Sequence, residues 1–395
     1  MNIVFLGGFT YPRGMAGTKR VRHVINGLRL HDDVLVSVLV LRQSSRANPL
    51  SGVYEGVAYH TVWGDLLGLN AALMMPVLFM KSRRTLRRLY KTGDYNVLYV
   101  YGPVTYDNVL LLRYAKQNGF KLVFDIVEDY DLALHISGSL KHRIRIRFIQ
   151  YANRVMKNLA NGLIVISLHL QRKYSGKGMP LHLLPISVDI TQYPEAPARF
   201  SDPVVMFYAG SFGHKDGVPV LLDAFEKLAA KNDRIKLVLT GKDTDEMMAK
   251  LHERVNVMPF GDRVVYMGYL DDVDYYAELG RADILCVPRI DSGYANAGFP
   301  FKLGEYLATG KPVIASAVSD IPSLLADKVD AMLVPAGDSD AIEKVVTDLL
   351  SDPAQAFRMG ANGRKVATRL FDYKSQGDDV YRFIRGMFCP SASRG

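Results

Sequence analysis

Two segments in the second half of the chain combine glycine-rich turns with charged side chains. In the first, an apolar run leads into YAGSFGHKDG, residues 208–217. Glycines such as Gly210 let the backbone approach a ligand closely, and Lys215 adds a positive charge. The helix predicted after this turn offers free N–H groups to an anion. The segment therefore predicts a phosphate site, although an ordinary strand-to-helix connection is also rich in glycine.

The second segment is NAGFPFKLGEYLATGKPVIAS, residues 296–316. A Gly-Phe-Pro turn enters a short helix that carries Lys302 and Glu305, and a glycine at position 310 ends it. Residues three apart lie on neighbouring parts of one helical face. The pattern indicates an anion site beside a carboxylate that can accept hydrogen bonds from sugar hydroxyl groups. The alternative is a surface ion pair in the first turn of the helix.

The elements that position these segments alternate between short β-branched runs and amphipathic helical stretches. This alternation is typical of α/β domains with a parallel, doubly wound sheet. We expect strands near residues 3–6, 34–41, 97–101, 122–125 and 163–166 in the first half. In the second half we expect strands near residues 204–209, 236–240, 264–267, 284–287, 313–315 and 331–334.

A chain of 395 residues is longer than one hydrophobic core usually supports, so two domains are expected. A proline-rich stretch without periodicity separates the two series of strands. The predicted division is an N-terminal domain at 1–185, a linker at 186–202 and a C-terminal domain at 203–372. Residues 373–395 are predicted to form a C-terminal helix that packs back on the N-terminal domain.

The motifs and their order resemble the retaining glycosyltransferases of family 4 (group 1). The resemblance covers most of the chain, through YAGSFGHKDGVPVLLDAF, RVVYMGYL, YYAELGRADILCVP, AGFPFKLGEYLATGKPVIAS and the linker LLPISVDITQY. It implies a GT-B fold, in which two Rossmann-like doubly wound domains face each other across an interdomain cleft. It also implies transfer of a sugar from a nucleoside diphosphate sugar to a glycan or lipid-linked acceptor, in bacterial cell-surface polysaccharide or glycoconjugate assembly.

The resemblance assigns roles to individual residues of this chain. Lys215 and the backbone N–H groups of the Gly-Phe-Pro turn would hold the donor diphosphate, Glu305 would bind the ribose, and Gly268 would border the base. We expect Lys215, Lys302 and Glu305 to be the catalytic set. The expected donor-binding set is Gly17, Gly210, Ser211, Lys215, Gly268, Tyr269, Leu270, Gly298, Phe299, Phe301, Lys302 and Glu305.

Three positions depart from the family pattern. Ala297 stands where a glutamate near the sugar ring is usual, and Ser211 replaces a common arginine, whose charge Lys302 could supply. The stretch FDIVEDY, residues 124–130, lacks the histidine that is frequent at the end of that N-domain strand. Ala297 also leaves open a second class of function, a non-catalytic sugar-nucleotide-binding or scaffolding protein of the same fold.

The acceptor side is expected in the N-terminal domain. Glu128 or Asp129 would orient the acceptor, with a capping or salt-bridge role as the alternative. Arg13 and Arg20 follow the first strand and would reach the diphosphate or an anionic acceptor, unless they are solvated loop charges. The same loop spells no G-x-G-x-x-G fingerprint, which disfavours a nicotinamide dehydrogenase.

The resemblance implies retention of configuration by front-face displacement, with positive charge at the leaving diphosphate as the main source of rate enhancement. The histidines are scattered and no Asp-x-Asp precedes a phosphate site, so we expect metal independence. No cofactor is expected, because the nucleotide sugar, a UDP-sugar or a GDP-sugar, is a substrate.

Positive charge is concentrated in the first half. Residues 1–185 hold 25 Lys and Arg against 10 Asp and Glu, whereas residues 186–395 hold 24 against 30. Basic stretches at residues 81–91 and 141–157 suit an anionic membrane surface; the alternative is that they are helices packed on the sheet with solvated arginines. No nucleic-acid motif accompanies the charge. The N-terminus lacks a signal-peptide pattern, so we expect a cytoplasmic protein or one peripheral at the inner face of the cytoplasmic membrane.

Overall fold

The computed structural model describes residues 1–43, 48–64, 74–129, 132, 140–176, 178–193 and 199–388. It forms two compact units. Unit 1 comprises Met1–Ser187 together with the C-terminal segment that begins at Tyr373, and unit 2 comprises Val188–Asp372. Parts of three expectations, namely the stretch 124–130 at residue 130, the linker at residues 194–198 and the C-terminal helix beyond residue 388, lie outside the described residues.

Unit 1 is built on an eight-stranded sheet in the order β3-β4-β2-β1-β5-β6-β7-β8. All neighbouring strands pair in parallel except β3 and β4, which form an antiparallel hairpin. The strand β1 is buried at every residue. Because a strand buried on both faces needs apolar side chains on both, its sequence is a nearly continuous apolar run. The strands are β1 (Asn2–Gly7), β2 (Leu35–Gln43), β3 (Ser51–Tyr54), β4 (Val57–Gly64), β5 (Asn96–Tyr101), β6 (Lys121–Ile126), β7 (Gly162–Val165) and β8 (Leu181–Leu183).

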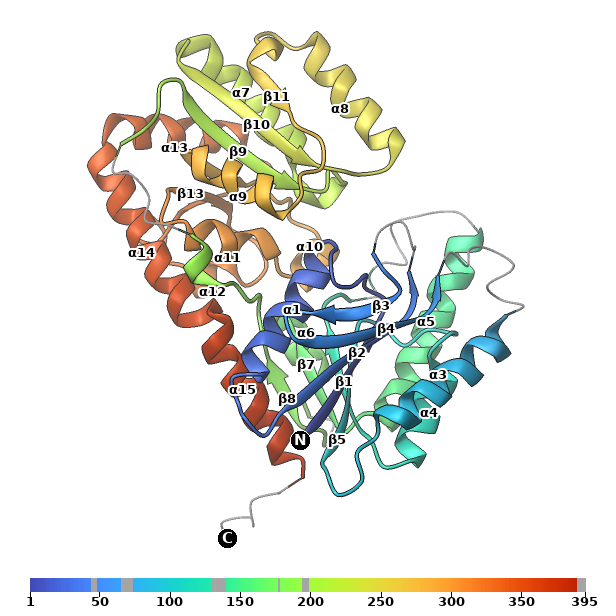
Figure 1. Ribbon diagram of the computed structural model, residues 1–395. Coiled ribbons are helices and arrows are strands. Elements are labelled where there is room, and N and C mark those ends of the chain that lie inside the picture. Colours follow the sequence, from blue (N-terminus) through green and yellow to red (C-terminus); the bar gives the residue numbers. More distant parts are fainter. Residues whose placement is uncertain are drawn as a thin grey trace. The chain divides into compact units, whose positions relative to one another are not determined.

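Helices cover both faces of this sheet (Figure 1). The helix α5 carries its buried residues at Ile146, Ala152 and Met156, whereas Ile144 and Tyr151 are exposed. The side of α5 that packs on the unit is therefore the one that carries Ile146, Ala152 and Met156. The helices are α1 (Ala16–Leu28), α3 (Met75–Leu89), α4 (Val109–Gln117), α5 (Leu140–Leu159), α6 (Leu168–Tyr174) and α15 (Tyr373–Gly386).

The last helix, α15, belongs to unit 1 and lies along α1 (Figure 1). The two helices cross where Gly27 meets Gly377. A Cβ added to Gly27 would lie 2.7 Å from the Cα of Gly377, so only glycine allows this approach. Val380 and Ile384 of α15 are fully buried in the same core cluster as Val24 of α1.

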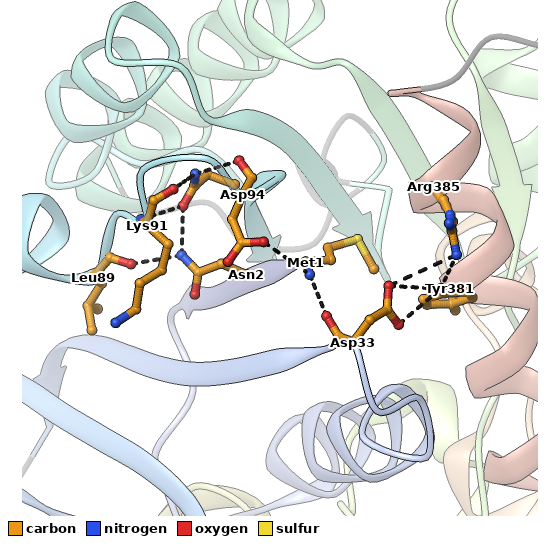
Figure 2. Close-up of polar contacts among 9 residues, drawn as sticks. Met1, Asn2, Asp33, Leu89, Lys91, Asp94, Tyr381 and Arg385 are labelled. Atoms are coloured by element: carbon orange, nitrogen blue, oxygen red, sulfur yellow. Dashed lines mark hydrogen bonds and ion pairs between the residues drawn. The ribbon is translucent and has the colours of Figure 1, made fainter.

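Polar contacts fix α15 to the start of the chain (Figure 2). The Tyr381 hydroxyl lies 3.0 Å from each carboxylate oxygen of Asp33, and Arg385 donates to the Tyr381 oxygen at 2.5 Å. The amino group of Met1 donates to the carbonyl oxygen of Asp33 and lies 3.6 Å from Asp94. The first strand and the last helix are therefore joined through the turn that precedes β2.

Unit 2 is built on a six-stranded parallel sheet in the order β11-β10-β9-β12-β13-β14. The chain moves outward from β9 to β11 and then returns to pair β12 with β9, so the order reverses between β9 and β12. Ligands of doubly wound sheets bind at such a switch point, outside the carboxyl ends of the strands. The strands are β9 (Val204–Gly210), β10 (Ile235–Gly241), β11 (Val264–Tyr266), β12 (Ile284–Val287), β13 (Val313–Ser316) and β14 (Met332–Val334).

The helices of unit 2 enclose one apolar core cluster beneath the switch point. Phe225 of α7 and Val346 of α13 are fully buried in this cluster. The helices are α7 (Val218–Lys231), α8 (Asp245–Val257), α9 (Asp272–Arg281), α10 (Gly293–Ala297), α11 (Phe301–Ala308), α12 (Ile321–Leu324), α13 (Ser339–Ser351) and α14 (Pro353–Phe371), with single 3-10 turns at η2 (Ile190–Gln192), η3 (His214–Asp216) and η4 (Gly261–Arg263).

These two parallel-sheet units confirm the expected fold class of two Rossmann-like α/β domains. Within the described ranges, no helix has the length and apolar character needed to cross a bilayer.

Candidate functional site: an anion site at the switch point of unit 2

The two glycine-containing segments predicted to hold phosphate meet at the carboxyl end of β9. The hydroxyl of Tyr306, on α11, accepts a hydrogen bond from the backbone N–H of Ala209 at 2.8 Å, which joins α11 to the carboxyl end of β9. A Cβ added to Gly210 would lie 2.5 Å from the Nζ of Lys302, so this side chain crosses directly over the glycine. The structure therefore brings the first segment and Lys302 into one place.

Lys302 is a largely buried cation. Its Nζ lies 3.9 Å from the ring centroid of Tyr208 and 3.8 Å from Oδ1 of Asp216. Burial lowers the pKa of Lys302 to about 8; the Asp216 carboxylate opposes this effect, and the charges of Arg289 and Lys215 add to it. Burial and the charges of Arg289 and Lys215 all disfavour the protonated form of Lys302, so this position is suited to bind an anion.

Asp216 and Arg289 complete the cluster, and the sequence analysis did not find either residue. Asp216 is buried and accepts a hydrogen bond from the Ser211 hydroxyl at 2.5 Å. Arg289 follows β12 and is 5% exposed. Its Nη2 donates to the carbonyl oxygen of Ala295 at 3.0 Å, and burial lowers its pKa. Arginine directly after a strand at the switch point is the signal that could have revealed it.

The turn after β9 and the loop after β12 are packed backbone to backbone. A Cβ at Gly217 would lie 1.7 Å from the carbonyl oxygen of Pro288, and the N–H of Ile290 donates to the carbonyl oxygen of Lys215 at 3.2 Å. Lys215 itself is half-buried, with its Nζ 4.8 Å from the ring centroid of Tyr294. Lys302 and Arg289 thus lie beside the buried carboxylate of Asp216, and Lys215 is close enough to Lys302 to lower its pKa.

The Gly-Phe-Pro turn lies at the start of α11, where first-turn N–H groups lack acceptors within the helix. The Ser319 hydroxyl donates to the carbonyl oxygen of Gly298 at 2.7 Å and fixes the turn. Phe299 is buried against Phe371, with ring centroids 6.0 Å apart, and Phe301 is the first residue of the helix. The residues predicted to donate backbone N–H groups to phosphate, Gly298, Phe299 and Phe301, therefore lie directly before Lys302 at the start of α11.

Glu305 lies one turn further along α11 and is half-buried. Its Oε2 accepts a hydrogen bond from the hydroxyl of Tyr275, on α9, at 2.7 Å. Tyr275 is buried, and burial raises its pKa well above the ordinary value, so it remains a neutral donor. The carboxylate predicted to bind the ribose is therefore held in one orientation by a tyrosine that sequence reasoning missed. Lys302 and Glu305 do not form the surface ion pair considered as the alternative.

The residues predicted to border the base lie at the carboxyl end of β11. The carbonyl oxygen of Gly268 accepts hydrogen bonds from the N–H of Gly241 at 2.9 Å and from the Thr240 hydroxyl at 2.6 Å. Tyr269 is exposed, with the Nζ of Lys242 4.5 Å from its ring centroid, and Leu270 is half-buried. These residues lie two strands away from the turn that carries Gly210.

The structure corrects the role of Arg20. Its side chain is fully buried in unit 1, where Nε and Nη2 bind the two oxygens of Asp125 at 2.8 and 2.9 Å. It also donates to the carbonyl oxygens of Leu184 and Pro185. Arg20 is therefore a core ion pair and is not available to an acceptor, because a buried guanidinium needs these partners to offset its desolvation.

The other predicted residues of unit 1 lie near the carboxyl edge of its sheet. Arg13 is exposed in the loop after β1, whose backbone is fixed by Asn48. Gly17 lies in the first turn of α1, where a Cβ would approach the Tyr101 hydroxyl to 2.8 Å. Both positions remain predictions for contact with ligand.

Glu128 is half-buried after β6, and Asp129 beside it is buried. Asp129 accepts a hydrogen bond from Nε2 of His169, on α6, at 2.9 Å, and also binds the ammonium group of Lys173. A histidine of the helix after β7 therefore lies against the stretch FDIVEDY, which contains none of its own. Because Nε2 donates to a carboxylate, Nδ1 of a neutral His169 is the acceptor nitrogen.

Within the described ranges, no three His, Cys, Asp or Glu side chains are grouped so that they could hold a metal ion.

The family match in a comparison with known proteins falls within unit 2. Residues 189–366 match the family model of glycosyl transferases group 1. A phosphatidyl-myo-inositol mannosyltransferase of Mycobacterium leprae is 27% identical over 203 residues, which is 50% of this chain and 52% of that protein. The chain spans about half the length of the first curated relatives it matches.

Solved structures share the fold over almost the whole chain. Sucrose-phosphate synthase from Thermosynechococcus elongatus superposes with a TM-score of 0.76 at 18% identity, covering 99% of this chain and 100% of that one. Anabaena HepE in complex with UDP-glucose gives a TM-score of 0.74 at 15% identity, covering 98% and 100%. At these identities the likeness supports the two-domain fold alone.

Proposed function

We propose that this chain, whose residues 189–366 belong to the family of glycosyl transferases group 1, transfers a sugar from a nucleoside diphosphate sugar to a glycan or lipid-linked acceptor. The observation that carries the proposal is the cation cluster at the switch point of unit 2. Lys302 and Arg289 lie beside the buried carboxylate of Asp216, and Lys215 adds a third positive charge near Lys302. Such an excess of buried positive charge is favourable once a diphosphate occupies it.

The proposed donor lies along the carboxyl edge of the unit 2 sheet. Its base borders Gly268, Tyr269 and Leu270, its ribose binds Glu305, and its diphosphate binds the cluster at β9. Charge that develops on the leaving diphosphate meets fixed cations and the N–H groups of the first turn of α11, so no reorganisation is needed during reaction. We propose a metal-independent transfer with retention of configuration, in which a donor phosphate oxygen helps to deprotonate the acceptor hydroxyl.

The sugar and base are proposed as classes. The mycobacterial relative is named a mannosyltransferase and the HepE complex holds UDP-glucose. A neutral hexose on UDP or GDP is therefore the donor class to test first.

The acceptor is proposed to bind unit 1 beside Glu128 and Asp129, where His169 offers Nδ1 to a hydroxyl group. A lipid-linked acceptor fits the exposed surface of α5. Ile144 is 60% exposed and Tyr151 is 58% exposed, and the neighbouring arginines Arg143, Arg147 and Arg154 are also exposed. Apolar side chains within a basic surface favour peripheral binding to an anionic bilayer, which we propose for the inner face of the cytoplasmic membrane.

Donor turnover tests the proposal. The purified full chain is incubated with UDP- and GDP-hexoses, with and without a polyprenyl-phosphate-linked sugar, and release of the nucleoside diphosphate is followed by chromatography in the presence of a chelator. The proposal expects release that depends on Lys215 and Glu305 and is insensitive to the chelator. Donor binding without any release under these conditions would favour the second candidate below.

The second candidate is a non-catalytic sugar-nucleotide-binding or scaffolding protein. Ala297 favours it, because this position is fully buried and carries no group that could hold the sugar where the family pattern has a glutamate. Under this alternative the donor binds to unit 2, but its sugar is not transferred and no product forms.

A further inference from the structure

Arg289 is a buried cation with an incomplete set of hydrogen bonds. Its guanidinium donates through Nη2 to the carbonyl oxygen of Ala295 at 3.0 Å. Nε is buried and has no hydrogen-bond partner among the described residues. Asp216 is close enough to stabilise the charge electrostatically but forms no ion pair with it in the part of the chain that the structure describes. A guanidinium buried in this state is unfavourable unless an anion completes its shell.

The order of the strands indicates which part of a ligand reaches Arg289. From the base-bordering residue Gly268 to Arg289, the sheet runs β11, β10, β9 and β12. Neighbouring strands are about 4.8 Å apart, so the loops after β11 and β12 are separated by about 14 Å along this edge. Gly210 lies between them, after β9. A nucleotide with its base at β11 and its first phosphate over Gly210 therefore directs its second phosphate toward Arg289.

We propose that Arg289 binds the distal phosphate of a nucleoside diphosphate, the group that carries the sugar before transfer and leaves with the nucleotide after it. The inference rests on the proposed function, because it assumes a nucleoside diphosphate in unit 2. It assigns the phosphate contacts unequally: Lys302 lies over Gly210 in the middle of the edge, and Arg289 lies at the end nearest the sugar.

The loop architecture supports this assignment. The Pro288 carbonyl oxygen packs against Gly217 with no space for a side chain, and Ile290 is bonded to the backbone of Lys215. Arg289, between these two anchors, is held at the turn that carries Lys215. These contacts fix the backbone of Arg289, and the hydrogen bond to Ala295 holds its guanidinium, so an arriving phosphate does not need to order a mobile side chain.

The test compares binding of UDP with UMP, and of GDP with GMP, by isothermal titration calorimetry on the full chain and its R289Q variant. Glutamine removes the charge and keeps a polar amide at about the position of Nε, two bonds short of the Nη2 that reaches Ala295. We expect the affinity for the nucleoside diphosphate to fall by about tenfold to about a hundredfold, the range for a charge-assisted hydrogen bond, and the monophosphate affinity to change less than about threefold. The matched control is R281Q, since Arg281 is an exposed arginine of unit 2 on α9.

Thermal melting separates a ligand role from a structural one. Because an unsatisfied buried charge is removed, R289Q without ligand should melt at or above the temperature of the wild type, yet gain less from added nucleoside diphosphate. R289K, which keeps the charge without the planar fork, should recover only part of the affinity.

Equal losses for the mono- and diphosphates, or unchanged diphosphate affinity in R289Q, would overturn the assignment to Arg289 while leaving the proposed function intact. A lower melting temperature of ligand-free R289Q together with unchanged affinities would mark Arg289 as structural. If the wild type binds neither UDP nor GDP, the proposed function and this inference fail together.

Discussion

The hydroxyl of Tyr275 donates a hydrogen bond to Oε2 of Glu305 at 2.7 Å, from α9 to α11. Glu305 is the carboxylate proposed to bind the ribose, and Tyr275 fixes which of its oxygens faces outward. A tyrosine buried at this position acts on the ligand through the carboxylate and does not need to touch the nucleotide.

Replacing Tyr275 with Phe should weaken nucleoside diphosphate binding by about 1 kcal/mol, the usual contribution of one hydrogen bond, or roughly fivefold. The effect should disappear with a 2′,3′-dideoxy nucleoside diphosphate, because that ligand makes no ribose contact to be weakened. Equal losses with both ligands, measured by calorimetry, would contradict a role through the ribose.

The shifted pKa of Lys302 predicts a pH dependence of stability. Its pKa is about 8 in the folded protein against an ordinary value of 10.5, so the unfolded chain binds more protons between these limits. The contribution of this residue to the free energy of unfolding therefore rises as the pH increases from about 8 to 10.5, by up to about 3 kcal/mol.

Lys302→Met should accordingly be more stable than the wild type at pH 7, and the difference should shrink toward pH 10. Denaturant unfolding of the ligand-free proteins at several pH values measures it. The same variant should bind nucleoside diphosphate more weakly at pH 7. A stability difference that is independent of pH would contradict the depressed pKa.

Gly210 and Gly213 lie within one turn but differ in backbone conformation, because φ is 151° at Gly210, where any side chain is strained, and −67° at Gly213. A Cβ at Gly210 would lie 2.5 Å from the Nζ of Lys302, whereas a Cβ at Gly213 would have no neighbour closer than 3.6 Å. Gly210→Ala should therefore displace Lys302 and lower diphosphate affinity by about tenfold, the loss of one charge-assisted contact. Gly213→Ala should bind normally, and similar losses in both variants would argue against the position of Lys302.

The Asp129–His169 couple predicts a separation of kinetic effects. His169→Gln should raise the KM for the acceptor or lower the turnover, with little change in the dissociation constant of the donor. His252→Gln, on α8 of unit 2, is the control. Loss of donor affinity in His169→Gln would count against an acceptor role for this residue.

The exposed apolar side chains of α5 predict binding to anionic lipid. Ile144→Ser combined with Tyr151→Ser should reduce co-sedimentation with phosphatidylglycerol-containing vesicles and leave turnover of a water-soluble acceptor unchanged. Val257→Ser, which removes an exposed apolar residue from unit 2, is the control. Binding that is insensitive to the α5 substitutions, or equal on neutral vesicles, would exclude this surface.

Much of the fold was predictable because parallel strands buried on both faces appear as apolar runs. All eleven expected strands correspond to strands of the structure. The hairpin of β3 and β4 was missed, since its Glu55-Gly56 turn is not one of the common Asn-Gly or Asp-Gly signals and its outer strand is exposed. Strand β8 was missed because three half-buried residues carry too little pattern.

The site was predictable only where its residues share a local motif. Lys215, Lys302 and Glu305 lie in segments whose spacing is recognisable, and the structure places Lys302 over Gly210. Arg289 and Tyr275 reach the site from other loops and helices, so their roles depend on tertiary packing. Arg20 shows the opposite case, a charged residue in a loop-to-helix segment whose partner, Asp125, is 105 positions away.

The helix α15 has a consequence for how the protein is made. Unit 2 is one continuous stretch, Val188–Asp372, but unit 1 needs the residues after Tyr373 to cover the α1 surface around Gly27. During synthesis from the N-terminus, most of unit 1 is translated first, but unit 1 cannot be completed until α15 has been made. Unit 2 therefore has its full sequence before unit 1 does. A ribosome that stops after Asp372 would release a protein with a complete unit 2 and an unfinished unit 1.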